Sequence, residues 1–144
     1  MKVKIKKLTE NALIPEYAKP GDAGMDLTAT SYYYDATNDN HVYGTGLAVE
    51  IPEGFVGLVF PRSSNRKTPH YLTNHVGVID SGYRGEIILT FKHRDETLNN
   101  DRPYNVGDRI GQLIIMPYPT IEFVESDELS ETERGTGGHG STGN

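Results

Sequence analysis

The chain has 144 residues, of which 35% are hydrophobic and none is cysteine, and its formal net charge is −6. This length predicts one domain, and the lack of cysteine excludes disulfides, thiolate nucleophiles and cysteine-based zinc sites. The negative charge argues against a groove for a nucleic-acid polymer, and without a signal peptide or a long apolar run we expect a soluble, intracellular protein with no membrane segment.

Short strand patterns follow one another along the chain, and each is bounded by glycine, proline, asparagine or aspartate. The predicted strands cover residues 3–6, 32–34, 47–51, 55–60, 76–79, 86–92 and 109–116. No window of ten residues carries a convincing apolar stripe at helical spacing. Regularly spaced short strands predict an all-β sandwich or barrel. The low apolar fraction further predicts a small core or apolar surface buried between subunits.

The first segment with candidate chemistry is residues 20–29, where glycines precede Asp26 as a strand begins. A carboxylate at this position could hold a hydrated Mg²⁺ ion at the edge of a site. The alternative is an Asx-type turn that closes a loop. The spacing alone favours the turn.

The second segment, residues 60–64, ends a predicted strand at Pro61 and continues with Arg62, Ser63 and Ser64. A guanidinium followed by two hydroxyls offers several hydrogen-bond donors to phosphate oxygens. A strand-ending turn with an exposed arginine explains the same residues about as well.

The third segment, residues 74–85, reads as a β-hairpin in which Ser81 and Gly82 turn the chain. Asp80 would then lie beside the turn, where a carboxylate can orient and deprotonate a water molecule. The backbone near Gly77 would offer donors and acceptors to a planar ligand edge, and Tyr83 a flat apolar face. The alternative is an ordinary hairpin with Asp80 as a turn residue.

The fourth segment, residues 106–113, reads as a turn that leads into a buried strand. Gln112 is the one amide within this apolar run, and a buried amide needs a hydrogen-bond partner. The sequence leaves open whether that partner is protein backbone or a ligand phosphate.

The fifth segment is the glycine-rich end of the chain, residues 134–144, which cannot bury enough apolar area to fold alone. Its glycines allow backbone N–H groups to converge on anionic oxygens, and Arg134 adds a planar cation. Taken by itself, such an end is more often a flexible linker. The chain contains no Walker phosphate loop, His-Glu-x-x-His or Gly-x-Ser-x-Gly motif.

Taken together and in this order, the five segments resemble the motifs of the trimeric dUTP pyrophosphatase (dUTPase) family. The matching residues are 23–29, 61–64, 77–85, 107–113 and 134–143. The resemblance implies a jelly-roll-like β-barrel or sandwich that forms a homotrimer, with sites between the subunits. It also implies a β domain, residues 1–133, and a flexible C-terminal arm, residues 134–144, that closes the active site.

The resemblance implies that the chain hydrolyses dUTP to dUMP and pyrophosphate. Asp80 would activate the water that attacks the α-phosphate, and Asp26 would reach Mg²⁺ through coordinated water. The implied substrate-binding residues are Arg62, Ser63, Ser64 and Gln112 for the phosphates, Asn74, Gly77 and Val78 for uracil, Tyr83 for deoxyribose, and Arg134, Gly138, His139, Gly140, Ser141 and Thr142 in the arm.

One arm residue departs from the family pattern, because His139 stands where phenylalanine is usual. An imidazole can still stack on uracil but covers less apolar area, so we expect weaker or pH-sensitive closure of the arm.

Two other functions remain open from the sequence. A dCTP deaminase shares the implied fold and would release ammonia, but the Asp80 segment and the arm favour a dUTPase. A nucleotide-sensing regulatory protein could use the same body to bind a protein partner. Retention of Asp80 and of the complete arm argues against such a catalytically inactive scaffold.

Overall fold

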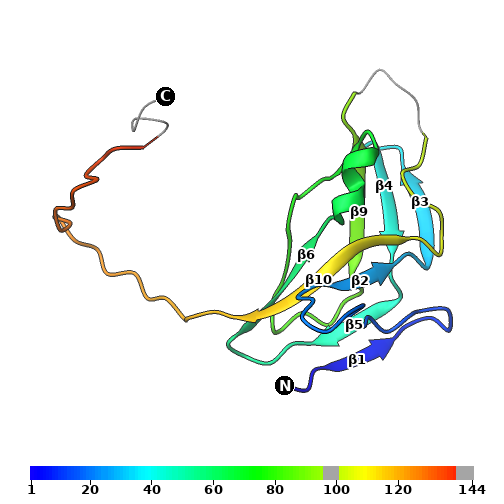
Figure 1. Ribbon diagram of the computed structural model, residues 1–144, viewed down its shortest axis with the longest axis horizontal. Helices are drawn as coiled ribbons and strands as arrows, with labels where there is room; N and C mark the ends of the chain where they lie inside the picture. Colours follow the sequence, from blue (N-terminus) through cyan, green and yellow to red (C-terminus); the bar gives the residue numbers. More distant parts are fainter. Residues whose placement is uncertain (96–100, 139–144) are drawn as a thin grey trace.

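The computed structural model describes residues 1–95 and 101–138, and strands supply nearly all of the regular structure in them (Figure 1). The strands are β1 (Lys4–Lys7), β2 (Met25–Thr28), β3 (Ser31–Asp35), β4 (Asn40–Gly44), β5 (Leu47–Glu50), β6 (Phe55–Phe60), β7 (His70–Leu72), β8 (Gly77–Ile79), β9 (Ile88–His93) and β10 (Arg109–Pro117). A short 3₁₀ helix, η1 (Ser63–Lys67), follows β6. The all-β prediction is therefore confirmed.

The strands pair antiparallel in two four-stranded sheets and one smaller sheet. The first four-stranded sheet has the order β2-β10-β6-β8, and the second has the order β3-β4-β9-β7. β1 pairs with β5 in a separate two-stranded sheet. Within the described residues neither large sheet closes on itself, so the architecture is an open sandwich and not a closed barrel.

One apolar core joins the two large sheets. It contains Leu27, Val59 and Leu113 from the first sheet and Tyr43, Leu89 and Phe91 from the second. Burial of each such side chain stabilises the fold by about 1.5–3 kcal/mol relative to exposure. The core therefore lies between the sheets and fixes their relative position, which in turn fixes the loops at their edges.

The predicted strands agree with the structure best where apolar residues are dense. The predictions for residues 55–60 and 109–116 correspond to β6 and β10, and that for residues 47–51 to β5. The prediction for residues 86–92 begins too early, because the backbone of Ile87 bonds to Thr45 and Leu47 at the β4–β5 connection. β4 and β7 were not predicted, since each carries a histidine that interrupts the apolar pattern.

The predicted hairpin over residues 74–85 is wrong. β8 pairs with β6, so that Val78 lies opposite Leu58, whereas β9 belongs to the other sheet. A turn does occur at the expected place, because the Tyr83 amide donates to the Asp80 carbonyl at 3.0 Å. The segment after Asp80 thus crosses from one sheet to the other instead of folding back on itself.

After β10 the described residues 118–138 run away from the sheets as a long extended segment (Figure 1). Several large apolar side chains on it are exposed, including Phe123 at 94% and Leu129 at 90%. None of the helices in the described residues is long and apolar enough to cross a membrane.

Candidate functional site

Asp80 lies directly after β8, at the first position of the turn that leaves this edge strand. Its side chain is exposed, and its carbonyl accepts the Tyr83 amide that closes the turn. The Arg84 guanidinium donates from Nη1 to the carbonyls of Ser81 and Tyr83, at 2.6 and 2.9 Å. The turn therefore has a fixed backbone that holds the Asp80 carboxylate at the rim of a pocket.

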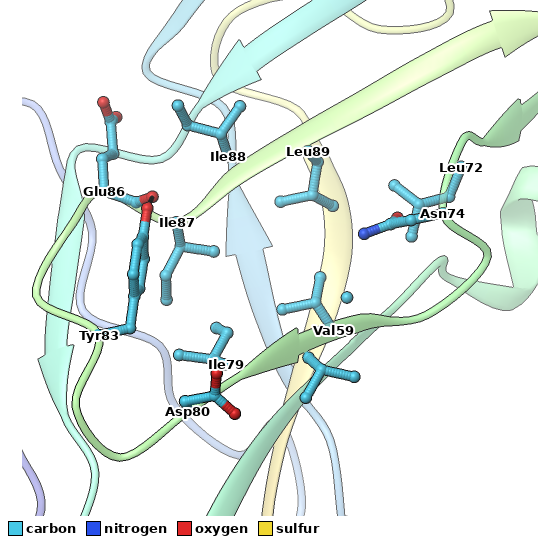
Figure 2. Close-up of a pocket in the computed structure, with 12 residues that line it drawn as sticks. Val59, Leu72, Asn74, Ile79, Asp80, Tyr83, Glu86, Ile87, Ile88 and Leu89 are labelled. Atoms are coloured by element: carbon cyan, nitrogen blue, oxygen red, sulfur yellow. Dashed lines mark hydrogen bonds between the residues drawn. The ribbon is translucent and has the colours of Figure 1, made fainter.

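That pocket has a volume of about 220 Å³ and lies between the edge of the first sheet and the start of β9. Its lining residues are Val59, Leu72, Asn74, Gly77, Val78, Ile79, Asp80, Tyr83, Glu86, Ile87, Ile88 and Leu89. Figure 2 shows Asp80 and Tyr83 on one side of it and Asn74 on the opposite side. The pocket thus combines an apolar floor with a carboxylate, an amide and an aromatic ring.

The Tyr83 ring is held against the pocket by its own hydroxyl. Tyr83 Oη donates to the Glu86 carbonyl at 3.0 Å, and Figure 2 shows the ring beside Ile87. The Glu86 carboxylate in turn accepts the Gly46 amide at 2.7 Å. These bonds connect the wall of the pocket to the β4–β5 turn.

β8 lines the pocket and is the edge strand of its sheet. Its one neighbour among the described strands is β6, with Gly77 opposite Val59 and Val78 opposite Leu58. In an antiparallel edge strand, alternate N–H and C=O groups point away from the partner strand and stay available to a ligand. Because such groups alternate along the strand, one of the neighbours Gly77 and Val78 turns its backbone groups to β6 and the other leaves them free for a ligand.

A second group of candidate residues centres on Asp26 in β2. Arg62 Nε donates to Asp26 Oδ1 at 2.8 Å, and Arg109 Nη1 donates to Asp26 Oδ2 at 3.0 Å. Arg62 Nη1 also donates to Ser64 Oγ at 3.3 Å. One carboxylate thus orients two guanidiniums. The alternative of an Asx-type turn at Asp26 is wrong, because Asp26 lies within strand β2.

Gln112 belongs to this second group. In β10 it lies opposite Asp26 of β2 and Phe60 of β6, and its Nε2 donates to the Pro61 carbonyl at 3.1 Å. The open question about its partner is answered in part, since protein backbone satisfies the donor. A Cβ atom added at Gly24 would lie 2.4 Å from Gln112 Oε1, so Gly24 makes room for this amide.

The donor set around Asp26 places limits on a metal ion. Among the described residues, no cluster of three or more histidine or acidic side chains could hold one. Mg²⁺ commonly keeps several waters and binds through one or two carboxylates together with substrate phosphates. Both oxygens of the Asp26 carboxylate accept hydrogen bonds from guanidiniums, so a cation at this position would depend mainly on a phosphate-bearing ligand.

The loop with Arg62, Ser63 and Ser64 is supported from behind by Asn65. The buried Asn65 side chain donates to the His70 carbonyl at 3.0 Å and accepts from Tyr104 Oη at 2.9 Å. Burial raises the pKa of Tyr104, so its phenol stays protonated as a donor at neutral pH. This support fixes η1 relative to β7, and with it Ser63 and Ser64 at the start of η1 and Arg62 directly before it.

Within one chain the candidate residues form two separate groups. Asn74, Gly77, Val78, Asp80 and Tyr83 line the 220 Å³ pocket, whereas Asp26, Arg62, Ser64 and Gln112 form the hydrogen-bonded group around Asp26. Ser63 lines a neighbouring groove that also contains Arg62 and Gln112. The single chain does not bring the two groups together into one pocket.

The candidate residues of the C-terminal arm belong to neither of these two groups. Arg134 and Gly138 lie at the end of the extended segment that points away from the sheets (Figure 1), and the Gly137 amide donates to the Arg134 carbonyl. His139, Gly140, Ser141 and Thr142 lie outside the described residues.

Sequence reasoning missed Arg109 and Glu86. Arg109 pairs with Asp26 across 83 positions of sequence, and Glu86 ties the pocket wall to Gly46. Neither residue stands out in a linear pattern, because an arginine at a strand start and a glutamate after a turn are both common surface features. Only the register of β2 on β10 shows that Arg109 reaches the carboxylate.

Comparison with a family model and with related sequences identifies the same family. Residues 10–143 match the dUTPase family model. A deoxyuridine 5'-triphosphate nucleotidohydrolase of Nocardia farcinica is 41% identical over 143 residues, covering 98% of this chain and 85% of the relative. One of Nautilia profundicola is 42% identical over 146 residues and covers 99% of both chains.

Solved dUTPase structures are also similar to this chain. A dUTPase variant of Staphylococcus bacteriophage 80alpha with dUpNHpp superposes with a TM-score of 0.83 at 30% identity, covering 99% of both chains. A dUTPase variant from phage phi11 of S. aureus, described with a structural Mg(II) ion, superposes with a TM-score of 0.73 at 30% identity, covering 89% of this chain and 98% of that one.

Proposed function

Because this chain belongs to the dUTPase family and is a hydrolase of dUTP, we propose that it cleaves dUTP to dUMP and pyrophosphate by attack of water on the α-phosphorus. The observation that carries the mechanism is the position of Asp80, exposed on a fixed turn at the rim of a nucleoside-sized pocket.

Asp80 acts as the general base. An aspartate at this rim can accept a proton from a water molecule and aim that water at the phosphorus. The O–P bond forms as the bond from the α-phosphorus to the bridging oxygen breaks, and pyrophosphate leaves with the electron pair. Positioning and charge neutralisation supply most of the acceleration in such a displacement.

Uracil is read by the open edge of β8 and by Asn74. Uracil presents O4 as an acceptor and N3–H as a donor, which backbone N–H and C=O groups at Gly77 and Val78 can match. Cytosine reverses this pattern and leaves both backbone groups unpaired, which can discriminate by roughly 10⁴-fold. The Tyr83 ring packs on deoxyribose, where a ribose 2′-hydroxyl would collide with it.

The triphosphate is held by the second group of residues. Arg62, Ser63, Ser64 and Gln112 offer donors to phosphate oxygens, and charge-assisted bonds from the guanidinium are the strongest of them. Asp26 would hold Mg²⁺ through coordinated water, and the ion would neutralise part of the phosphate charge.

Both groups serve one substrate if copies of the chain assemble, and we propose a homotrimer with the active sites between subunits. The segment between β10 and the C-terminal arm supports this arrangement, since its Phe123 and Leu129 side chains are 94% and 90% exposed in a single chain. The C-terminal arm, residues 134–144, then closes the site of a neighbouring subunit, with Arg134, Gly138, Ser141 and Thr142 on the phosphates and His139 over uracil.

The test is pyrophosphate release from dUTP, dTTP, dCTP and UTP by the wild-type chain and by Asp80→Asn. We expect dUTP to be the preferred substrate and the variant to lose about 10²–10⁴-fold in kcat while still binding a non-hydrolysable dUTP analogue. Full activity of Asp80→Asn would exclude the general-base role. Ammonia release from dCTP would instead indicate a deaminase, and wild-type binding without turnover would indicate a nucleotide sensor.

A further inference from the structure

A groove of about 540 Å³ lies beside Gln112 and is lined by three arginines. Its lining residues are Phe60, Pro61, Arg62, Ser63, Asn65, Arg66, Arg94, Gln112 and Ile114. The arginines come from three different parts of the fold. Arg62 follows β6, Arg66 belongs to η1, and Arg94 follows β9.

The groove is positively charged in an acidic protein. Among the described residues that line it, three carry guanidiniums and none carries a carboxylate, although the whole chain has a net charge of −6. Arg66 and Arg94 are exposed, whereas Arg62 is partly buried and paired with Asp26. Guanidiniums gathered on one surface attract anions and can bind phosphate in a bidentate manner. The groove therefore has the chemistry of a phosphate site that extends beyond Arg62.

The fold holds the two additional arginines in place through their backbones. The Arg94 amide donates to the Pro69 carbonyl at 2.9 Å, which fixes the end of β9 beside the loop after η1. η1 itself is anchored by the buried Asn65, which is bonded to both His70 and Tyr104. These bonds fix the backbone near Arg66 and Arg94, and both side chains are exposed.

We propose that Arg66 and Arg94 are phosphate-binding residues that extend the triphosphate site, and that they set the preference for dUTP over nucleotides with shorter phosphate chains. This inference rests on the proposed function and adds two residues to it. Arg62, Ser63 and Gln112 line the same groove, so the phosphate chain continues from them toward Arg66 and Arg94. The 220 Å³ pocket shares no lining residue with this groove.

The experiment uses Arg66→Gln, Arg94→Gln and the double variant, with Lys67→Gln as the matched control. Lys67 is adjacent to Arg66 in η1 and loses the same charge, but it does not line the groove. Binding of dUpNHpp and of dUMP is measured by calorimetry at several salt concentrations, together with kcat and KM for dUTP.

We expect each arginine variant to bind dUpNHpp about tenfold more weakly and to raise KM with little change in kcat. The salt dependence of dUpNHpp binding should become shallower, because fewer ionic contacts remain. Binding of dUMP should stay within twofold of wild type, as should every property of Lys67→Gln.

Two outcomes would overturn the inference. Arginine variants that bind dUpNHpp as well as Lys67→Gln would exclude contact with the phosphates. Arginine variants that lose dUpNHpp and dUMP affinity equally would show that the substitutions disturb the structure and do not remove a phosphate contact. In that case Arg66→Lys and Arg94→Lys would lose the same affinity. A wild-type chain without dUTP turnover would contradict the proposed function itself, which is a separate result.

Discussion

The imidazole rings of His41 and His70 meet edge to face, with their centroids 5.3 Å apart, in the β3-β4-β9-β7 sheet. Each residue is only 2% exposed, and the His93 ring lies 4.9 Å from that of His70. Burial lowers the pKa of both His41 and His70, and the neighbouring imidazoles lower that of His70 further. Asp39, beside His41, and Asp101, beside His70, oppose these shifts in part.

This pair predicts acid sensitivity of the fold. Because the folded-state pKa of each buried histidine lies below the unfolded value of about 6.5, the unfolded chain binds more protons as the pH falls. The stability contribution is complete above pH of about 6.5 and is lost as the pH falls through the folded-state pKa. Urea unfolding at pH 7.5 and 5.0, at one protein concentration, should show a clear loss of stability at pH 5.0.

Replacement of His70 by phenylalanine tests the origin of that loss. The variant should have a smaller difference between its unfolding free energies at the two pH values, whatever its stability at pH 7.5. His75→Asn serves as the control, because His75 is exposed and its positive φ of 59° suits asparagine. An unchanged pH difference in His70→Phe would show that other groups cause the acid sensitivity.

A second prediction concerns the carboxylate between Arg62 and Arg109. Asp26→Asn keeps the shape of the side chain but removes the charge that orients both guanidiniums. We expect kcat/KM for dUTP to fall between about ten- and a hundredfold and the free energy of unfolding to fall by about 1–2 kcal/mol. The Mg²⁺ concentration for half-maximal rate should rise in Asp26→Asn more than in Arg109→Gln, and equal Mg²⁺ dependence in both would remove Asp26 from metal binding.

A third prediction concerns the space that Gly24 leaves for Gln112. In Gly24→Ala the added methyl group would press on Gln112 Oε1, and the flexible amide would move before the backbone does. We expect a several-fold rise in KM for dUTP with the fold retained. If the methyl group acts through the Gln112 amide, Gly24→Ala should raise KM little further in a Gln112→Ala background. A double-mutant cycle therefore tests whether the two positions are coupled. Additive losses would show an independent role for Gly24.

A fourth prediction concerns the arm. A chain that ends at Glu133 loses no residue of the buried core, so it should unfold at the same denaturant concentration as the full chain. Turnover of dUTP should fall on the order of 10²-fold, as expected when groups that position the substrate are removed. Unchanged turnover in the truncated chain would exclude the arm from catalysis.

The local setting of the candidate residues was predicted better than their contacts. Asp80 was expected beside a turn at the end of a strand, and it is there, but in a segment that crosses between sheets and not in a hairpin. Gln112 was expected to need a partner, and the Pro61 carbonyl is that partner. The Asp26 contact with Arg109 had no signal, because it joins residues 83 positions apart through strand register.

The amino-acid sequence alone determined the class of the fold and the kinds of side chain present at the site, since strand patterns and turn residues are local properties. Only the tertiary structure decided how those side chains combine. Strand pairing sets β8 on β6, directs Arg62 and Arg109 to one carboxylate and leaves the pocket at Asp80 apart from the arginine groove. These relationships depend on long-range register, which is fixed by the shared core and not by neighbouring residues.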